Sequence, residues 1–265
     1  MSVITISRGS FIGGKLLAER LAGKLGYRSI DRDVVLQKAA AGGVKHEELR
    51  EALLRPPSLF DRLITHKKYV YLTLLQAALA EEVRDGKVVY HGYAGHLLLS
   101  DASPVFRVRV IAAPEFRVKM AQEHLKLSRH DALAHIHKAD VQRKKWMHAL
   151  YGVDWEDPSL YDMVLNLGHL FGIEEACDAI VSVVRQHKGL EFTPEHRALM
   201  YDFALASRVR AALATHAPTA GIHVHVTARD GVVSIDGVIE DAEPLTEVER
   251  VAREIPGVTD VQLRY

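Results

Sequence analysis

The stretch Val3-Ile-Thr-Ile-Ser7-Arg-Gly9-Ser-Phe-Ile-Gly13-Gly14-Lys15 decides how the chain begins to fold. Its first five residues form a short β-branched run, which predicts a strand, and helical periodicity follows over residues 13–25. The glycines in between allow consecutive backbone N–H groups to point inward. The sequence therefore predicts a strand, a glycine-rich loop and a helix in direct succession.

The spacing Gly9-x4-Gly14-Lys15 matches the P-loop signature up to its last position. A helix N-terminus attracts anions through its dipole and its unsatisfied N–H groups. Lys15 adds a mobile positive charge that suits terminal phosphates. We therefore expect a nucleotide's phosphates to be bound by Gly9, Ser10, Gly13, Gly14 and Lys15.

The position after Lys15 departs from the signature, because Leu16 stands where a serine or threonine would hold magnesium. Ser10 is the candidate metal ligand that replaces it. Two alternatives stay open: Ser7 could reach the ion, or phosphates and water could hold it alone.

Strands alternate with helices up to about residue 187. After the first strand, further strands are expected at 27–30, 87–90, 105–111 and 163–167. This alternation predicts an α/β fold, a P-loop NTPase-type parallel sheet with helices on both faces. Because ligands bind at the carboxyl ends of such strands, residues 7–15, Asp31, 91–95 and 112–117 should gather around one crevice.

The pattern changes near residues 189–194. A helix is expected over 195–215, followed by two alternating strands joined by an Asp-Gly turn signal at Asp230-Gly231, a second helix and a last strand. This order, αββαβ, predicts a small separate α+β domain. The predicted organisation is a first domain over 1–188, a linker over 189–197 and a second domain over 198–265.

Composition limits the function classes. The 34 basic and 34 acidic residues cancel, which argues against a broad nucleic-acid-binding surface. Cys177 is the single cysteine, so no intrachain disulfide can form and a reducing compartment fits. The first residues do not resemble a secretory signal, and the apolar stretch 69–80 is too short to span a bilayer. We therefore expect a cytoplasmic chain without a transmembrane segment.

Over most of residues 2–187 the sequence resembles the cytidylate kinase-like family of nucleoside monophosphate kinases. The opening block is Ile4-Thr-Ile-Ser-Arg8, Gly13-Gly14, Leu17–Ala22, Leu25–Tyr27 and Asp31-Arg32, and the later block is Lys138–Arg143, Tyr151–Pro158 and Tyr161–Asn166. The later block is the more specific, because several separate features recur in order. The resemblance implies phosphoryl transfer from ATP to a monophosphate, pyrimidine rather than purine, with Mg2+.

The resemblance also implies roles for charged residues. Cations that would neutralise the transferring phosphoryl group are Arg117, Arg129, Lys138 and Arg143. Of these, Arg117 and Arg143, together with Lys15 and Asp140, are the catalytic candidates. Asp140 would orient Arg143 or the acceptor end, and Lys138 would bind the nucleotide.

The acceptor would be bound by Asp31, Arg62 and Arg129. A solvated helix charge is the alternative for each of these candidate charges. One departure concerns Tyr93, which stands where the family usually has an arginine after glycine.

Residues 204–265 resemble a BON domain. The residues that carry this resemblance are Ile222–Thr227, Asp230–Val238, Val251-Ala252, Ile255–Val258 and Val261. The resemblance implies a module that binds a lipid, a small ligand or a partner protein, without catalytic residues.

Three hypotheses follow. The first is a cytidylate-kinase-like enzyme fused to a regulatory BON module. The second is a nucleotide sensor with little or no catalysis, which Leu16 and Tyr93 favour. The third is an interaction scaffold in which the tail is the active part. The sequence leaves open the acceptor base, the ligand of the tail and whether the chain forms a homo-oligomer.

Overall fold

The computed structural model describes residues 2–54, 62–92, 94–237 and 242–264, without the side chains of 52–54, 62–66 and 242–244. The chain divides into two compact units. The first comprises residues 1–32, 86–100 and 104–192, and the second comprises 33–85, 101–103 and 193–265. The domain boundaries expected at residues 188 and 198 stay a prediction.

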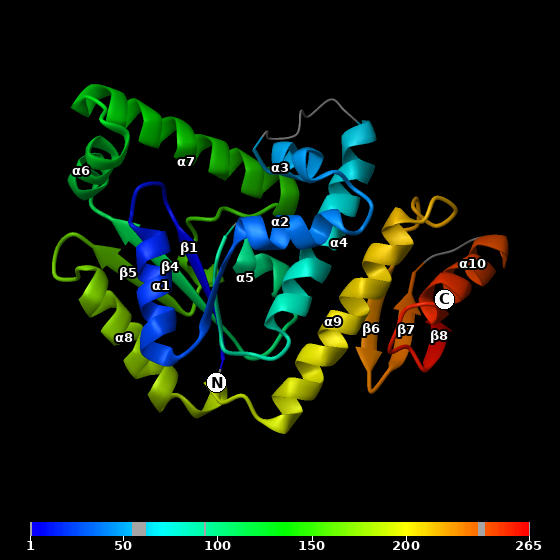
Figure 1. The fold of residues 1–265 in the computed structure, drawn as a ribbon. Helices are drawn as coiled ribbons and strands as arrows, with labels where there is room; N and C mark the ends of the chain where they lie inside the picture. Colours follow the sequence, from blue (N-terminus) through cyan, green and yellow to red (C-terminus); the bar gives the residue numbers. More distant parts are fainter. Residues whose placement is uncertain (1, 55–61, 93, 238–241, 265) are drawn as a thin grey trace. The chain divides into compact units, whose positions relative to one another are not determined.

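The first unit is built on a five-stranded parallel sheet (Figure 1). Its strands are β1 (Val3–Arg8), β2 (Arg28–Asp31), β3 (Val88–His91), β4 (Val105–Ala112) and β5 (Met163–Leu167). Their order in space is β2-β3-β1-β4-β5, and every pairing is parallel. The predicted α/β fold is confirmed, and β1 lies at the centre of the sheet.

Helices flank this sheet. They are α1 (Gly14–Leu25), α5 (Gly95–Leu98), α6 (Pro114–Leu125), α7 (Arg129–Tyr151) and α8 (Ile173–Gln186), with short 3-10 helices η1 (Pro158–Leu160) and η2 (Lys188–Leu190). Helices α1 and α8 pack together, and their buried side chains join those of the central strand in one core. That core includes Ile4, Ile6, Leu17, Leu21, Cys177 and Ile180.

The turn from β1 into α1 depends on a glycine. Gly13 is the N-cap of α1 and has a φ of 72°, in the left-handed region that glycine adopts without steric cost. Its carbonyl accepts a hydrogen bond of 2.9 Å from the backbone N–H of Leu17. The chain therefore passes from the carboxyl end of the central strand straight into a helix N-terminus.

The second unit joins helices from two distant parts of the chain. Its helices are α2 (Arg32–Ala40, from Asp33 on), α3 (His46–Leu54), α4 (Arg62–Val83), α9 (Pro194–Thr215) and α10 (Ala242–Arg253). Helix α4 packs along α9. Helix α4 begins at Arg62, before the apolar stretch that starts at residue 69, and residues 65–68 ahead of that stretch are polar.

A three-stranded sheet completes the second unit. Strands β6 (His225–Arg229) and β7 (Val232–Asp236) are antiparallel, and β8 (Asp260–Arg264) pairs with β7 in parallel. Asp230 and Gly231 both have positive φ, 51° and 84°, as a tight hairpin turn requires. The buried face of the sheet packs on α9 and α10 around Val209, Val226, Val233, Val248 and Val261.

One short helix, α5, is absent from the sequence-based assignment, since four residues are too few for periodicity to show. Among the residues that the structure describes, no helix combines the length and apolar character needed to cross a bilayer.

The core of the first unit generates a stability prediction. Leu21 is fully buried, whereas Leu16 on the same helix is 42% exposed. Leu21→Ala should lower the free energy of unfolding by about 2–5 kcal/mol, because it leaves a cavity. Urea unfolding followed by tryptophan fluorescence reports on this unit, since Trp146 and Trp155 both belong to it. Leu16→Ala is the matched control and should change stability by less than about 0.5 kcal/mol; equal losses would contradict the packing described.

Candidate functional site

Arginine side chains pack against the backbone of the glycine-rich loop. A Cβ atom at Gly14 would lie 1.7 Å from Cδ of Arg8, so only glycine admits the Arg8 side chain there. At Gly9 a Cβ atom would lie 3.3 Å from Nη2 of Arg117. The two glycines therefore let guanidinium groups come close to the backbone, in addition to freeing N–H groups at the helix N-terminus.

Two of the predicted arginines bind the backbone of this loop. Arg117, on α6, donates from Nε to the carbonyl of Ser10 at 2.9 Å. Arg143, on α7, donates from Nη1 to the carbonyl of Arg8. Helices α6 and α7 thus place two positive charges at the start of α1.

Asp140 forms an ion pair with Arg117. Its Oδ2 lies 2.7 Å from Nη2 of Arg117, and both side chains are largely buried. Sequence reasoning expected Asp140 to orient Arg143 or the acceptor end. The Oδ1 atom of Asp140 is buried and has no hydrogen-bond partner within the described part of the chain.

A tryptophan lies against two arginines beside the loop. The Cζ atom of Arg109 is 4.3 Å from the centroid of the Trp155 ring, and Cζ of Arg143 is 5.2 Å from the same ring. Such guanidinium–aromatic contacts are attractive and fix the orientation of the guanidinium plane. Arg109, which is 6% exposed, also donates from Nη1 to the carbonyl of Trp155 at 2.5 Å.

Sequence reasoning did not find Arg109 or Arg8. A signal was present, because Arg107 and Arg109 interrupt the otherwise apolar run of β4 with two charges. Charged residues inside a buried strand require partners, and this favours a site rather than a core.

Tyr161 contacts both Trp155 and Ser7. Its Oη donates to the carbonyl of Trp155 at 2.7 Å and lies 3.2 Å from Oγ of Ser7. The hydroxyl of Ser7, one alternative for holding the ion, is therefore already within hydrogen-bonding distance of Tyr161.

Two histidines lie close to these residues. His96 is 3% exposed, packs against the Tyr161 ring, and has no hydrogen-bond partner on either ring nitrogen among the described residues. Burial, with the charges of Arg107 and Arg109, lowers the pKa of His96 to about 4. Burial and then the charge of Arg8 lower the pKa of His91, whereas Asp31 opposes this shift.

The remaining predicted residues are placed differently. Lys15 is 70% exposed and lies 3.7 Å from Glu19, one helical turn on. Asp31 ends β2 opposite His91 of β3, at the carboxyl edge of the sheet. Arg129 pairs with Glu115 at 2.6 Å, with both side chains exposed.

The other predicted positions are Lys138, Arg62 and Tyr93. Lys138 is exposed on α7. Arg62 begins α4 in the second unit, and its side chain lies outside the described part of the structure, as does the whole of Tyr93. The structure therefore brings together the glycine loop, Arg117, Asp140 and Arg143, whereas Arg129 is bound to a neighbouring carboxylate.

The residues that the structure describes offer few side-chain ligands for a magnesium ion. No group of three or more histidine, cysteine or acidic side chains that could hold a metal occurs among the described residues. The side chain of Leu16 offers no oxygen. A hydrated ion held mainly by phosphate oxygens remains compatible with this donor set, since Mg2+ retains several waters in many proteins.

The arrangement suits an anion with several negative charges. One loop gathers several positive charges. The guanidinium groups of Arg8, Arg117 and Arg143 contact it, and the positive end of the α1 dipole and Lys15 lie beside it. Asp140 counters part of this charge. Phosphate groups would satisfy both the charge and the backbone N–H donors.

Comparisons with known proteins agree with this chemistry. The model of the cytidylate kinase-like family matches residues 3–169, and the model of the BON domain matches residues 201–265. A cytidylate kinase of Ignicoccus hospitalis is 28% identical over 184 residues, 68% of this chain and 97% of that protein. A cytidylate kinase of Thermococcus kodakarensis is 26% identical over 168 residues, 63% of this chain and 80% of that protein.

Among solved structures, an uncharacterized protein from Eubacterium ventriosum has a similar fold. Its TM-score is 0.56 at 18% sequence identity, over 70% of this chain and 99% of that one. At this identity the likeness concerns the fold alone.

The buried His96 generates a pH prediction. Its folded pKa of about 4 lies below its ordinary value of 6.5, so the unfolded chain takes up a proton that the folded chain does not. The free energy of unfolding should therefore fall as the pH drops from 6.5 to 4, with His96 contributing about 3 kcal/mol to the loss. His91 adds to the loss with the same sign.

Urea unfolding at several pH values checks this expectation. His96→Phe should flatten the pH dependence, whereas His130→Phe, at an exposed position of α7, should leave it unchanged. If both variants keep the slope of the unchanged chain, His96 does not carry the effect.

Proposed function

Since this chain belongs to the cytidylate kinase-like family, we propose that it transfers the γ-phosphoryl group of ATP to a pyrimidine nucleoside monophosphate of the CMP type. The observation that carries the proposal is the contact of Arg117 and Arg143 with the loop that opens α1. The two relatives from Ignicoccus hospitalis and Thermococcus kodakarensis, which are named cytidylate kinases, support CMP as the acceptor.

Phosphoryl transfer needs positioning and charge neutralisation more than covalent chemistry by the protein. In our proposal the backbone N–H groups of residues 9–14 bind the β- and γ-phosphates. Lys15 turns from Glu19 toward them, which costs little because that ion pair is exposed. Arg143 and Arg117 neutralise the charge that develops on the transferred group.

Three residues support these groups in the proposed mechanism. Asp140 acts through Arg117, since their ion pair fixes the guanidinium beside the loop. Trp155 acts through Arg143 by contact with its guanidinium. Lys138 would bind the nucleotide from the exposed side of α7.

We propose Asp31, Arg62 and Arg129 as acceptor-binding residues. Asp31 ends a strand at the carboxyl edge of the sheet, where ligands bind in such folds. Arg129 would have to leave Glu115 to serve this role, and an exposed pair allows it.

ATP is the proposed donor, and Mg2+ would neutralise its phosphates. Because the chain offers few oxygens, we propose that phosphate and water supply most ligands and that Ser10 supplies a hydroxyl.

The BON module would bind a lipid, a small ligand or a protein, and we propose a cytoplasmic location.

Removing the loop cation tests the enzyme. Lys15→Ala should lower kcat/KM for CMP at least about 100-fold in a coupled ATP assay, because it removes a charge that faces the phosphates in the transition state. Lys119→Ala, an exposed lysine of α6, is the control and should stay within about twofold. A folded chain that turns over no nucleoside monophosphate would contradict the proposal.

A nucleotide sensor remains the second candidate, and the exposed Leu16 favours it. The two candidates differ when a hydroxyl is restored. If the chain is an enzyme limited by its metal contact, Leu16→Thr should raise Mg2+-dependent kcat by about tenfold. Leu16→Val, which has a similar shape without the hydroxyl, is the control. A sensor should instead show ATP-dependent thermal stabilisation, with no turnover by any of the three chains.

A further inference from the structure

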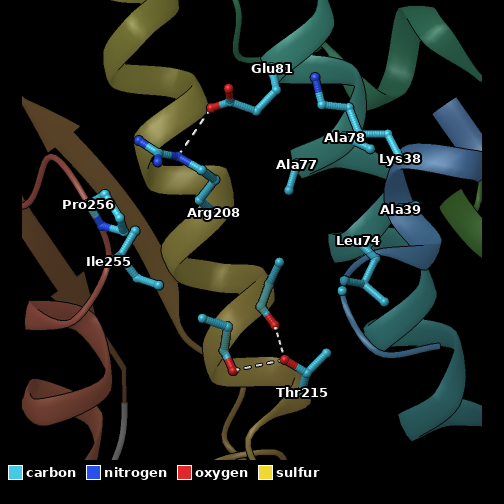
Figure 2. A pocket seen from close by; sticks show the side chains of 13 residues that line it. Lys38, Ala39, Leu74, Ala77, Ala78, Glu81, Arg208, Thr215, Ile255 and Pro256 are labelled. Carbon is cyan, nitrogen blue, oxygen red and sulfur yellow. Dashed lines mark hydrogen bonds and ion pairs between the residues drawn. The ribbon is translucent and has the colours of Figure 1, made fainter. Parts of the chain in front are cut away.

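The second unit contains a pocket that the phosphate chemistry does not use. Its volume is about 380 Å³, which lies in the range of small-molecule sites. Residues of α2 and α4 form one side, and residues of α9 and the turn after α10 form the other (Figure 2). The pocket is therefore lined by residues of two chain segments, 33–85 and 193–265, which belong to the same compact unit.

Small and aliphatic side chains line most of this pocket. They include Leu74, Ala77 and Ala78 of α4, Ala211 and Ala212 of α9, and Ile255 after α10. Alanines on both helices leave the space that larger side chains would otherwise fill. Such a wall suits an apolar body.

Charged groups gather at one end of the pocket (Figure 2). Arg208 Nε lies 3.1 Å from Glu81 Oε1, and the other oxygen of Glu81 lies 2.8 Å from Nη1 of Arg84. Lys38 also lines the pocket and pairs with Glu82 at 2.6 Å. Of these residues, Lys38, Glu81 and Arg208 line the pocket, so its lining carries two cations and one carboxylate.

The surrounding contacts fix the two sides of the pocket to each other. The Tyr69 ring of α4 stacks on His223, with centroids 4.4 Å apart and planes 14° apart. Tyr201 of α9 donates to Asp85 at 2.8 Å and lies under the guanidinium of Arg84. Both contacts join the segment 33–85 to the C-terminal segment, so the two sides of the pocket are also linked outside it.

We propose that this pocket binds a small organic anion with an apolar, ring-sized body. The alanine and aliphatic wall would bury the body, and Arg208 and Lys38 would attract the anionic group. The site is independent of phosphoryl transfer, so a chain without kinase activity would still bind such a ligand.

Two matched probes test the proposal on the full chain. 8-Anilino-1-naphthalenesulfonate carries the anion, and N-phenyl-1-naphthylamine has the same rings without the sulfonate. We expect one saturable site for the sulfonate by fluorescence and calorimetry, and binding of the neutral probe at least about tenfold weaker. Equal affinity of the two probes, or several equivalent sulfonate sites, would overturn the proposal.

Variants locate the binding. Ala212→Leu fills the pocket from a half-buried position and should weaken sulfonate binding at least about tenfold, whereas Ala198→Leu, exposed on the same helix, should not. Arg208→Gln should weaken it about three- to tenfold, and Arg197→Gln, exposed on that helix, should leave it unchanged.

Circular dichroism confirms that each variant is folded. If Ala212→Leu is not folded, Ala77→Val fills the same pocket from α4 with a smaller change. Unchanged binding in a folded pocket-filling variant, or equal losses in the matched controls, would overturn the proposal.

Discussion

The first unit depends on the contact between arginine side chains and the backbone that leaves the central strand. Arg117 and Arg143 come from two helices far along the chain, and both donate to carbonyls of the segment 8–10. These bonds place positive charge beside the positive end of the α1 dipole. The arrangement is electrostatically unfavourable without an anion, and Asp140 relieves only part of it. A polyphosphate ligand is the natural counter-charge.

Glycine has two functions in this loop, and they have different physical origins. At Gly13 the backbone has a positive φ, which glycine tolerates best. At Gly9 and Gly14 the absence of Cβ makes room for Arg117 and Arg8. The glycines of this motif therefore determine the backbone conformation and also leave space for the arginine side chains, whereas the motif is usually explained by the backbone conformation alone. Leu16 changes neither function, which is why the loop keeps its geometry without the metal-binding hydroxyl.

The second unit shows how an insertion acquires a core. Residues 33–85 lie between β2 and β3 in the sequence but belong to the second unit. Their helix α4 packs along α9 of the C-terminal segment. The ion pair from Glu81 to Arg208 and the stacking of Tyr69 on His223 supply polar and aromatic contacts between the two segments. Neither segment shows the partners Arg208 and His223 in its own periodicity, because Glu81 and Arg208, like Tyr69 and His223, lie more than 100 residues apart in the chain.

The sequence by itself determined the strand–loop–helix at residues 3–25, the alternation that makes a parallel sheet, and the Asp230-Gly231 hairpin, since these follow from local periodicity and glycine geometry. It also pointed to Arg117, Asp140 and Arg143 through a family resemblance. Only the tertiary structure decided that Asp140 pairs with Arg117, that Arg109 and Trp155 lie beside Arg143, and that α4 packs on α9. Such choices depend on which distant side chains meet after folding, and sequence spacing does not encode those distances.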